Sequence, residues 1–411
     1  MSSIWTTEAD IGLACARGLT PYALSEARAL GFKIVADDRD SVTVRGTMLD
    51  ALRLNLHLRT AHRVLFPVGR FEAKNLDHLY NHALEIPWED WLDPDGYFTV
   101  HGAVHNDTVR DTRMPALHLK DAVADRMRKA CGRRPDSGKE NKGAALFFIW
   151  RERDLRIFID TSGLPLSRRG YRLIPGKAPM QEALAAACVM ATGWKGDSPF
   201  IAPMCGSGTP AIEAAMIAKG RAPALTRDYF AFRHLRGYGT PLEGKPWFSS
   251  LPHGLDLPPS PSPDTVWKTL VDEAVNREKP MAEMPKIIVT DISHEAVRIA
   301  RANAKAANMD RYLTFGVCDF AETALPYGNP GVIFVNPEYG ERMGDYEELY
   351  PLYQRIGAWY RENSRYTGCV FTSSPRLARA IGSEPDKLLP FFNGALDCRL
   401  LVFQGAARRE R

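Results

Sequence analysis

The stretch FIAPMCGSGTPAIEAAMIA at residues 200–218 places an apolar segment, a glycine-rich turn and an alanine-rich segment in that order. This order predicts a strand that enters a helix through a turn at Gly206 and Gly208, where glycine lets the backbone bend tightly and approach a ligand. The spacing is neither the GxGxxG of dinucleotide-binding proteins nor the GK[ST] of P-loop proteins. The stretch therefore predicts a ligand-binding turn of another kind at the carboxyl end of a strand.

Strand and helix patterns alternate around this stretch, from about residue 164 to the end of the chain. The predicted helices are 180–192, 210–218, 294–308, 350–362 and 376–381, and the predicted strands are 200–202, 286–290, 312–317, 331–335 and 367–372. Such alternation with buried apolar strands is typical of a parallel, doubly wound α/β sheet. A proline-rich segment at 241–263 interrupts the pattern and is interpreted as a surface insertion loop.

Two of the predicted strands end in an acidic residue. In KIIVTDISHEAVRIARANAKAANM (286–309), Asp291 is placed to hydrogen-bond two ribose hydroxyls, although Asp291 or Ser293 could instead cap the following helix. In LTFGVCDF (313–320), Asp319 could accept a hydrogen bond from an adenine amino group or merely cap a loop. Each acid therefore keeps a ligand-binding and a structural interpretation.

A fourth strand, in GVIFVNPEYGER (331–342), delivers Asn-Pro-Glu-Tyr into a loop. The Asn336 side-chain oxygen and the Pro337 carbonyl could hold the N–H groups of an exocyclic amine, and Tyr339 could stack on its base. An isolated NPxY sequence is usually a β-turn. Its position downstream of three candidate ligand-binding segments favours the catalytic interpretation.

The first 163 residues alternate short strand and helix patterns, which predicts one or two small α+β units. Between Arg110 and Arg156, thirteen basic residues stand against seven acidic ones, a local charge of +6. This excess is either a solvated helix face with a polar loop or a surface that contacts phosphates. The segment SRRGYRLIPGKAP (167–179) is interpreted as a linker into the second half.

The composition agrees with a globular protein of two or three domains. The chain has 411 residues, of which 45% are hydrophobic and 25% charged, and its net charge of +4 neither requires nor excludes a nucleic-acid partner. No apolar run is long enough to span a membrane and no secretory signal is visible, so we expect a cytoplasmic protein. Seven scattered cysteines without a CxxC pair, and His78 and His82 without the glutamate of a zincin, predict no metal site.

Together these motifs resemble the class I S-adenosylmethionine-dependent methyltransferases and, more narrowly, the bacterial THUMP-domain RNA guanine-N2 methyltransferase family. The resemblance is carried, in one order, by RRGYR (168–172), KAPMQEALAAACVMATGWKGDSPFIAPMCGSG (177–208), FAFRHL (230–235), DISHEAVRIARANAKAA (291–307), NPEYGER (336–342) and FFNGALDCRLLVF (391–403). It implies a Rossmann-like methyltransferase domain at 164–411, with a mostly parallel sheet and a carboxyl-terminal antiparallel hairpin. A ferredoxin-like α+β unit at 1–55 and a THUMP RNA-binding domain at 56–163 would precede it.

The resemblance also implies a cofactor, S-adenosylmethionine, an RNA partner and a set of site residues. The cofactor set is Pro203, Cys205, Gly206 and Gly208 for its methionine part, Asp291 and Ile292 for its ribose, and Asp319 for its adenine. The target base would be held by Asn336, Pro337 and Tyr339. The residues assigned to RNA are Arg126, Lys129, Arg133, Arg134, Arg168 and Arg169.

Two departures from the family pattern leave more than one function open. Ala202 stands where the family usually has aspartate, and Glu338 stands where it usually has a second proline. The leading hypothesis is methyl transfer to the exocyclic N2 of a guanine in RNA, with 23S rRNA favoured over tRNA. The alternatives are a DNA adenine-N6 methyltransferase and a non-catalytic RNA-binding or ribosome-assembly protein with a degenerate methyltransferase domain. The sequence does not indicate the oligomeric state.

Overall fold

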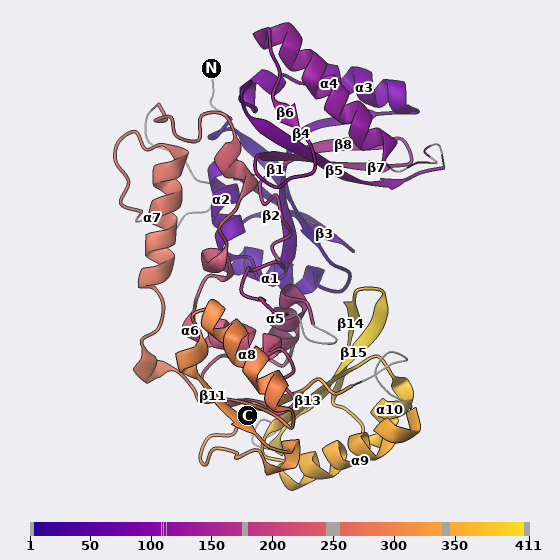
Figure 1. Ribbon diagram of the computed structural model, residues 1–411, viewed down its shortest axis with the longest axis vertical. Helices are drawn as coiled ribbons and strands as arrows, with labels where there is room; N and C mark the ends of the chain where they lie inside the picture. The colour runs from indigo at the N-terminus through magenta and orange to yellow at the C-terminus, as the bar shows by residue number, and fades with distance from the viewer. Residues whose placement is uncertain are drawn as a thin grey trace. The chain divides into compact units, whose positions relative to one another are not determined.

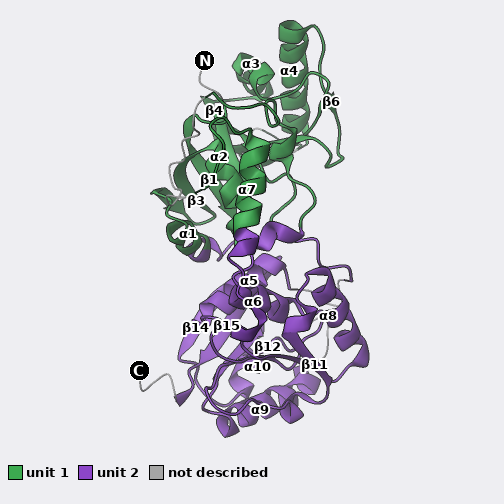
Figure 2. Cartoon of the chain, turned by 90° about the vertical axis from the view of Figure 1, so that its left-hand side faces the viewer, with its two compact units in different colours: residues 1–15, 23–166, 227–273 green, residues 16–22, 167–226, 274–411 purple. Residues whose placement is uncertain are grey.

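The computed structural model describes residues 4–107, 109, 111, 113–174, 180–243, 255–338 and 346–406. The chain forms two compact units, one of residues 1–15, 23–166 and 227–273, the other of residues 16–22, 167–226 and 274–411 (Figure 2). The chain passes from the first unit to the second between 166 and 167, close to the expected boundary at 164. The segment 227–273 groups with the first unit by its contacts, although it lies within the stretch 164–411 that the sequence predicts to be one domain.

The first unit is built on one eight-stranded sheet with the strand order β2-β3-β1-β4-β8-β7-β5-β6 (Figure 1). Its strands are β1 (Glu8–Cys15), β2 (Ile34–Asp38), β3 (Ser41–Thr47), β4 (Ala61–Glu72), β5 (Tyr97–His105), β6 (Asp136–Ser137), β7 (Ala144–Arg151) and β8 (Asp154–Asp160). Strand β4 pairs antiparallel with β1 on one side and with β8 on the other. The two small units expected at 1–55 and 56–163 therefore share a single sheet, joined through β4.

The helices of the first unit follow from local sequence signals. They are α1 (Thr20–Ala29), α2 (Met48–His57), α3 (Leu76–Glu85), α4 (Met114–Cys131) and α7 (Pro263–Asn276). Helix α2 begins in a capping box, in which the Thr47 hydroxyl accepts the Asp50 N–H and the Asp50 carboxylate accepts the Thr47 N–H. Helix α4 ends at Gly132, whose φ of +74° suits a left-handed helix terminus. Figure 1 shows α3 and α4 lying together over the sheet.

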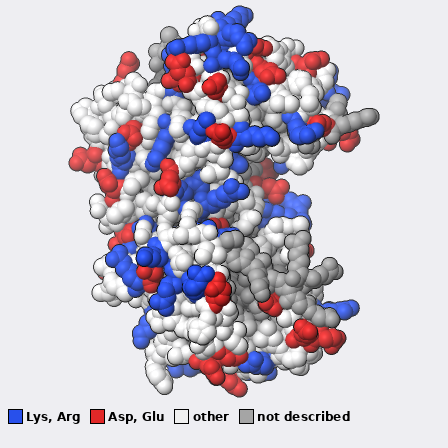
Figure 3. Space-filling model, viewed as in Figure 1, with Lys and Arg blue, Asp and Glu red and all other residues white. Residues whose placement is uncertain are grey.

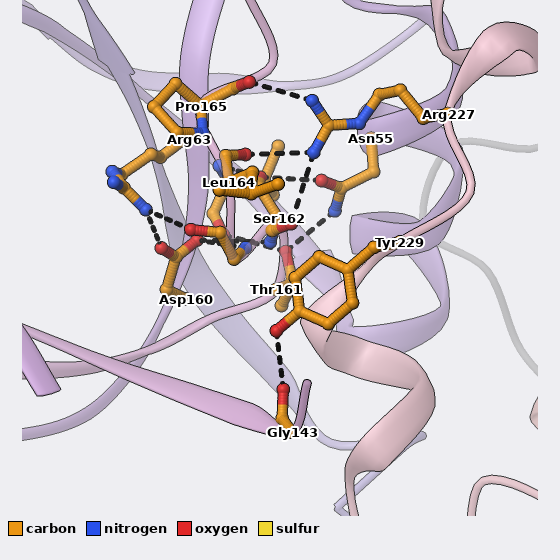
Figure 4. Close-up of polar contacts among 12 residues, drawn as sticks. Asn55, Arg63, Gly143, Asp160, Thr161, Ser162, Leu164, Pro165, Arg227 and Tyr229 are labelled. Carbon is orange, nitrogen blue, oxygen red and sulfur yellow. Dashed lines mark hydrogen bonds and ion pairs between the residues drawn. The ribbon is translucent and has the colours of Figure 1, made fainter. Parts of the chain in front are cut away.

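Residues 227–243 are fastened to the first unit by contacts with backbone carbonyls around the end of β8 (Figure 4). The Arg227 guanidinium donates to the carbonyl oxygens of Pro165 at 2.7 Å and Leu164 at 3.0 Å. The Tyr229 hydroxyl donates to the Gly143 carbonyl at 2.6 Å. Because a charged donor strengthens such hydrogen bonds, Arg227 accounts for the return of this segment to the first unit.

The second unit is a seven-stranded sheet with the order β11-β10-β9-β12-β13-β15-β14. Its strands are β9 (Phe200–Ala202), β10 (Ile287–Asp291), β11 (Leu313–Val317), β12 (Val332–Val335), β13 (Thr367–Thr372), β14 (Lys387–Asn393) and β15 (Leu396–Phe403), and its helices are α5 (Glu182–Ala191), α6 (Thr209–Lys219), α8 (His294–Ala306), α9 (Tyr346–Glu362) and α10 (Pro375–Ala380). Strands β9 to β13 pair in parallel, whereas β15 is antiparallel to both of its neighbours. The predicted doubly wound sheet with a terminal hairpin is confirmed.

The strand order brings the candidate segments to one edge of this sheet. Strands β10 and β12 both pair with β9, at Ile287 and Val332 opposite Phe200, so the chain reverses its direction across the sheet at β9. Ligands of open α/β sheets bind at such a switch point, beyond the carboxyl ends of the strands. The loops that follow β9, β10 and β12 start there.

The proline-rich segment 241–263 lies partly outside the described residues. Its described parts, 241–243 and 255–262, contain no helix or strand, and α7 begins at Pro263. These parts belong to the first unit. Within the described part of the chain, no helix has the length and apolar character needed to cross a bilayer.

Candidate functional site

The turn after β9 requires its two glycines for different reasons. Gly206 and Gly208 have φ values of +50° and +81°, and the Gly208 N–H donates to the Cys205 carbonyl at 2.7 Å. A Cβ on Gly208 would lie 2.9 Å from the Cβ of Ala300 on α8, whereas a Cβ on Gly206 would meet nothing within 4 Å. Gly208 therefore allows the turn before α6 to lie close against Ala300 of α8, while Gly206 borders open space.

Asp291, the last residue of β10, is hydrogen-bonded to this turn. Its Oδ2 accepts the Gly206 N–H and its Oδ1 accepts the Ser293 N–H, both at 3.0 Å. The side chain of Ser293 caps α8 by accepting the Ala296 N–H, so the capping role belongs to Ser293. Each oxygen of a carboxylate has two lone pairs, so Asp291 can still accept hydrogen bonds from two hydroxyls. Beside it, Ile292 is 73% exposed.

Asp319 has a structural role that engages only one of its two carboxylate oxygens. Its Oδ1 accepts the Ala321 N–H at 3.0 Å and an N–H of Arg355 on α9 at 2.7 Å. Although burial opposes it, these hydrogen bonds hold the pKa of Asp319 below its usual value. The loop-capping interpretation is therefore correct, and Oδ2 remains for the proposed contact with adenine. Sequence reasoning missed Arg355 because nothing local links it to an acid 36 residues away.

Asn336 follows β12 and carries an unusual side chain. Its Oδ1 is buried and accepts no hydrogen bond from the described residues. A buried polar atom without a partner costs about 1–3 kcal/mol, so such atoms call for an explanation. Pro337 is buried and Glu338 is exposed. The expected stacking residue, Tyr339, lies outside the described residues.

The loop at Asn336 is connected to α9 and β13. The Tyr353 hydroxyl of α9 donates to the Glu338 carbonyl oxygen at 3.3 Å and is hydrogen-bonded to the Thr372 hydroxyl at 3.0 Å. Burial raises the pKa of Tyr353 well above its usual value, so its proton stays in place at neutral pH. Tyr353 thus positions the backbone just beyond Asn336 and Pro337.

The remaining groups near the glycine turn give no sign of a nucleophile or a metal site. Pro203 and Cys205 are buried. Burial and the neighbouring Asp291 charge raise the pKa of the Cys205 thiol, which opposes formation of the reactive thiolate. Among the described residues, no three Cys, His, Asp or Glu side chains lie close enough together to hold a metal ion.

Asn303, a residue that the sequence reasoning missed, holds the glycine turn after β9 in place through hydrogen bonds. It is fully buried on α8, where its amide donates to the Ser207 carbonyl at 3.0 Å and its oxygen accepts the Leu173 N–H at 3.0 Å. One side chain thereby fixes both the glycine turn and the segment that enters the second unit. An asparagine on the apolar face of a predicted helix is a signal that could have identified it.

The expectation that Arg169 binds RNA is wrong. Arg169 is 1% exposed and forms an ion pair with Glu213 of α6 at 3.3 Å. Tyr171 donates to the same carboxylate at 2.9 Å. This part of the RRGYR motif therefore stabilises the second unit from its interior, whereas the neighbouring Arg168 is exposed.

The basic stretch of the first unit is largely neutralised by acids. Figure 3 shows Lys and Arg gathered with acidic side chains among them at the top of the view, where Figure 1 places α3 and α4. Arg126 forms an ion pair with Glu89, and Arg133 forms one with Asp95 at 2.9 Å. No acid within the described ranges pairs with Lys129 or Arg134. These two side chains are therefore the most available members of the expected RNA-binding set in this unit.

Three family models match the chain in the predicted order. They describe an RlmL ferredoxin-like domain at 10–65, a THUMP domain at 73–142 and an RMKL-like methyltransferase domain at 169–401. The ribosomal RNA large subunit methyltransferase K/L of Syntrophotalea carbinolica is 36% identical over 403 residues, which cover 96% of this chain and 53% of the relative. The chain thus spans about half the length of the curated relatives it matches.

Solved structures share the fold over nearly the whole chain. A protein from Listeria monocytogenes, described as an N6-adenine-specific DNA methylase, has a TM-score of 0.81 at 29% identity, with 97% of each chain covered. A protein described as a methyltransferase and crystallised with SAH has a TM-score of 0.82 at 24% identity, with 98% of this chain and 99% of that chain covered. These similarities confirm the predicted domain types and the class of fold.

Proposed function

The chain belongs to the family of RMKL-like methyltransferases, and we propose that it transfers a methyl group from S-adenosylmethionine to the exocyclic N2 of a guanine in RNA, with 23S rRNA as the favoured substrate. The observation that carries this proposal is the buried Oδ1 of Asn336, which has no hydrogen-bond partner among the described residues, at the sheet edge that also holds Asp291. The names of the ribosomal RNA methyltransferase relatives and the match to a THUMP domain support RNA as the substrate.

The residues at the carboxyl ends of β9 and β10 fit the cofactor. Open space beside Gly206 leaves room for its methionine part. The Asp291 carboxylate is already oriented by two backbone N–H groups, so it presents its remaining lone pairs to a ribose without further ordering. S-adenosylmethionine supplies a methyl group on a positively charged sulfur, and none of the residues described above needs to form a bond to it.

Asn336 and Pro337 would orient the acceptor amine. The lone pair of the guanine N2 is delocalised into the ring, and carbonyl oxygens that accept its N–H groups direct the nitrogen towards the methyl donor. The Asn336 Oδ1 provides one such acceptor and thereby gains a hydrogen-bond partner that the described residues do not give it. Catalysis then rests on alignment and on preorganised acceptors, and the base must leave its stack to reach them.

The decisive experiment separates cofactor binding from transfer. We expect Asn336→Ala to lower the methylation rate of rRNA from a strain lacking this protein by about 10²–10³-fold, the usual effect of removing one preorganised polar group. Calorimetry with S-adenosylmethionine should give an unchanged affinity. Asn336→Asp is the matched variant, because it keeps an acceptor oxygen and should retain more activity than the alanine variant. Equal losses of cofactor affinity and transfer would contradict this role.

The alternative functions differ from the proposed one either in the RNA that is methylated or in whether the protein methylates RNA at all. Mass mapping of modified nucleosides in rRNA and tRNA from the same strain distinguishes the two RNA substrates. A protein that binds rRNA but neither binds S-adenosylmethionine nor methylates RNA would be the non-catalytic alternative. Within the proposal, Lys129, Arg134 and Arg168 contact phosphates, while Arg126 and Arg133 do so only if RNA displaces their acidic partners.

A further inference from the structure

The second unit contains a cavity of about 630 Å³ beyond the carboxyl end of β13. Its walls come from the residues after β13, from α10, and from the hairpin strands β14 and β15. The volume lies within the roughly 300–1,000 Å³ that is usual for small-ligand sites. None of the described residues assigned above to the cofactor or to the acceptor amine lines it.

The cavity lies next to the Asn336 loop, on the side away from the cofactor residues. In the sheet, β12 separates β9 and β10 from β13 and β15. Val335, the last residue of β12, pairs with Val370, so Thr372 at the end of β13, which lines the cavity, lies beside the start of the loop that carries Asn336 and Pro337. The Thr372 hydroxyl also belongs to the hydrogen-bonded chain that ends at the Glu338 carbonyl. A substrate held at Asn336 would therefore extend towards this cavity.

The walls combine apolar surface with two charges of opposite sign. Pro375, Leu388 and Leu401 contribute apolar surface, and Leu388 remains 57% exposed. Arg399 is paired with Asp397. The side chains of Arg379 and Glu384 are exposed, and no hydrogen bond or ion pair joins either of them to any described residue.

These features match the chemistry of a guanine nucleotide. The flat faces of the base are apolar, its N1–H and N2–H donors lie on one edge and suit a carboxylate, and its phosphate suits a guanidinium. A purely apolar ligand could form neither a hydrogen bond nor an ion pair with Arg379 or Glu384. A free anion would find only one cation without an acidic partner and would be repelled by Glu384.

We propose that this cavity binds an unstacked guanine nucleotide adjacent to the methylated one in the substrate RNA. The base lies against Pro375 and Leu388, Glu384 accepts from its donor edge, and Arg379 contacts its phosphate. This inference rests on the proposed function, because it assumes that RNA reaches Asn336. It adds a determinant of sequence context on the methyltransferase unit itself, separate from the THUMP domain.

The kinetic test compares two arginines on the same short helix. Arg379 lines the cavity, whereas Arg376 does not and instead lies over the Tyr346 ring. We expect Arg379→Ala and Glu384→Gln each to raise KM for rRNA about tenfold, the loss expected for one hydrogen bond to a charged group, with kcat within about twofold. Arg376→Ala should leave both constants unchanged. Unchanged KM in the cavity variants, or the same increase in Arg376→Ala, would overturn the proposal.

A binding experiment tests the cavity without relying on methyl transfer. With the cofactor site saturated by S-adenosylhomocysteine, binding of guanosine 5′-monophosphate is followed by ligand-observed NMR. Binding should persist in Asn336→Ala and disappear in Ser383→Trp, which places a large ring at an exposed wall of the cavity. No binding to the unaltered protein, or binding that depends on Asn336 alone, would refute the cavity assignment. If binding follows the cavity but no RNA is methylated, the proposed function fails and the nucleotide site stands.

Discussion

Replacing Gly208 by alanine tests whether glycine is needed at this position for packing inside the protein or for binding of the ligand. Gly208 has a φ of +81°, and the added Cβ would lie 2.9 Å from the Cβ and 3.2 Å from the Cα of Ala300. Gly206 offers a matched control in the same turn, because its φ of +50° is also left-handed but its added Cβ would meet nothing within 4 Å.

The magnitude follows from two separate costs. A left-handed backbone costs a residue with a Cβ about 1–2 kcal/mol, and both variants incur this cost. Only Gly208→Ala also crowds Ala300 of α8 against the start of α6, which adds about 1–3 kcal/mol of overpacking. We therefore expect a loss of about 2–5 kcal/mol for Gly208→Ala and about 1–2 kcal/mol for Gly206→Ala.

Hydrogen exchange of the α6 amides measures these costs locally, without assuming that the two units unfold together. The affinity for S-adenosylmethionine, measured by calorimetry, gives the second readout. Gly206→Ala should weaken cofactor binding more than its small loss of stability explains, because its methyl group enters the space proposed for the ligand. Equal opening free energies of α6 in the two variants would refute the packing argument. Unchanged cofactor affinity in Gly206→Ala would refute the assignment of the open space.

Three further predictions concern charged groups. Arg169→Met leaves the Glu213 carboxylate buried without its cation, so the free energy of unfolding should fall by about 3–5 kcal/mol in urea titrations, while RNA affinity at a permissive temperature stays unchanged. Arg355→Met removes a hydrogen bond that lowers the pKa of Asp319, so NMR titration should show that pKa rising. Because the lowered pKa stabilises the folded state fully above the usual value of 3.8 and progressively less as the pH falls through the lowered pKa, the variant should lose about 0.2–1 kcal/mol at pH 7, and this difference should vanish below the lowered pKa. Lys129→Ala should weaken RNA binding and reduce the slope of log affinity against log salt by about 0.7–0.9, and an unchanged slope would exclude a phosphate contact.

The fold of the second unit could be predicted because its strands and helices carry strong local signals. The sequence predicts strand β13 at its observed bounds, 367–372, where a short apolar centre lies between two β-branched threonines and every residue is buried. Helix α8 shows a clear apolar stripe and a capping serine, and the structure has both. The order of the glycine turn, the two acids and the Asn-Pro loop then places the site at one edge of the sheet.

Features that depend on distant partners could not be read from the sequence. The local pattern around Arg169 indicates a basic linker, but the partner that buries it lies on α6. Strands β1, β2 and β8 were not predicted, because mixed polar and apolar residues define short or peripheral strands weakly. The return of residues 227–243 to the first unit depends on carbonyl groups around Pro165, and carbonyls carry no sequence signal.

The cofactor side and the acceptor side of the proposed site differ in how many of their polar groups are hydrogen-bonded within the protein. On the cofactor side, Asp291 and Asn303 are held by backbone N–H and carbonyl groups, so their geometry is set before a ligand arrives. On the acceptor side, the Asn336 Oδ1 and the side chains of Arg379 and Glu384 have no hydrogen-bond partner among the described residues. A buried polar atom without a protein partner, such as the Asn336 Oδ1, calls for a partner from outside the chain, whereas the exposed side chains of Arg379 and Glu384 are solvated and free to contact a ligand. Under the proposed function, this asymmetry corresponds to a preformed cofactor site beside an acceptor site that the substrate completes, and we expect substrate selection at β12, β13 and the hairpin.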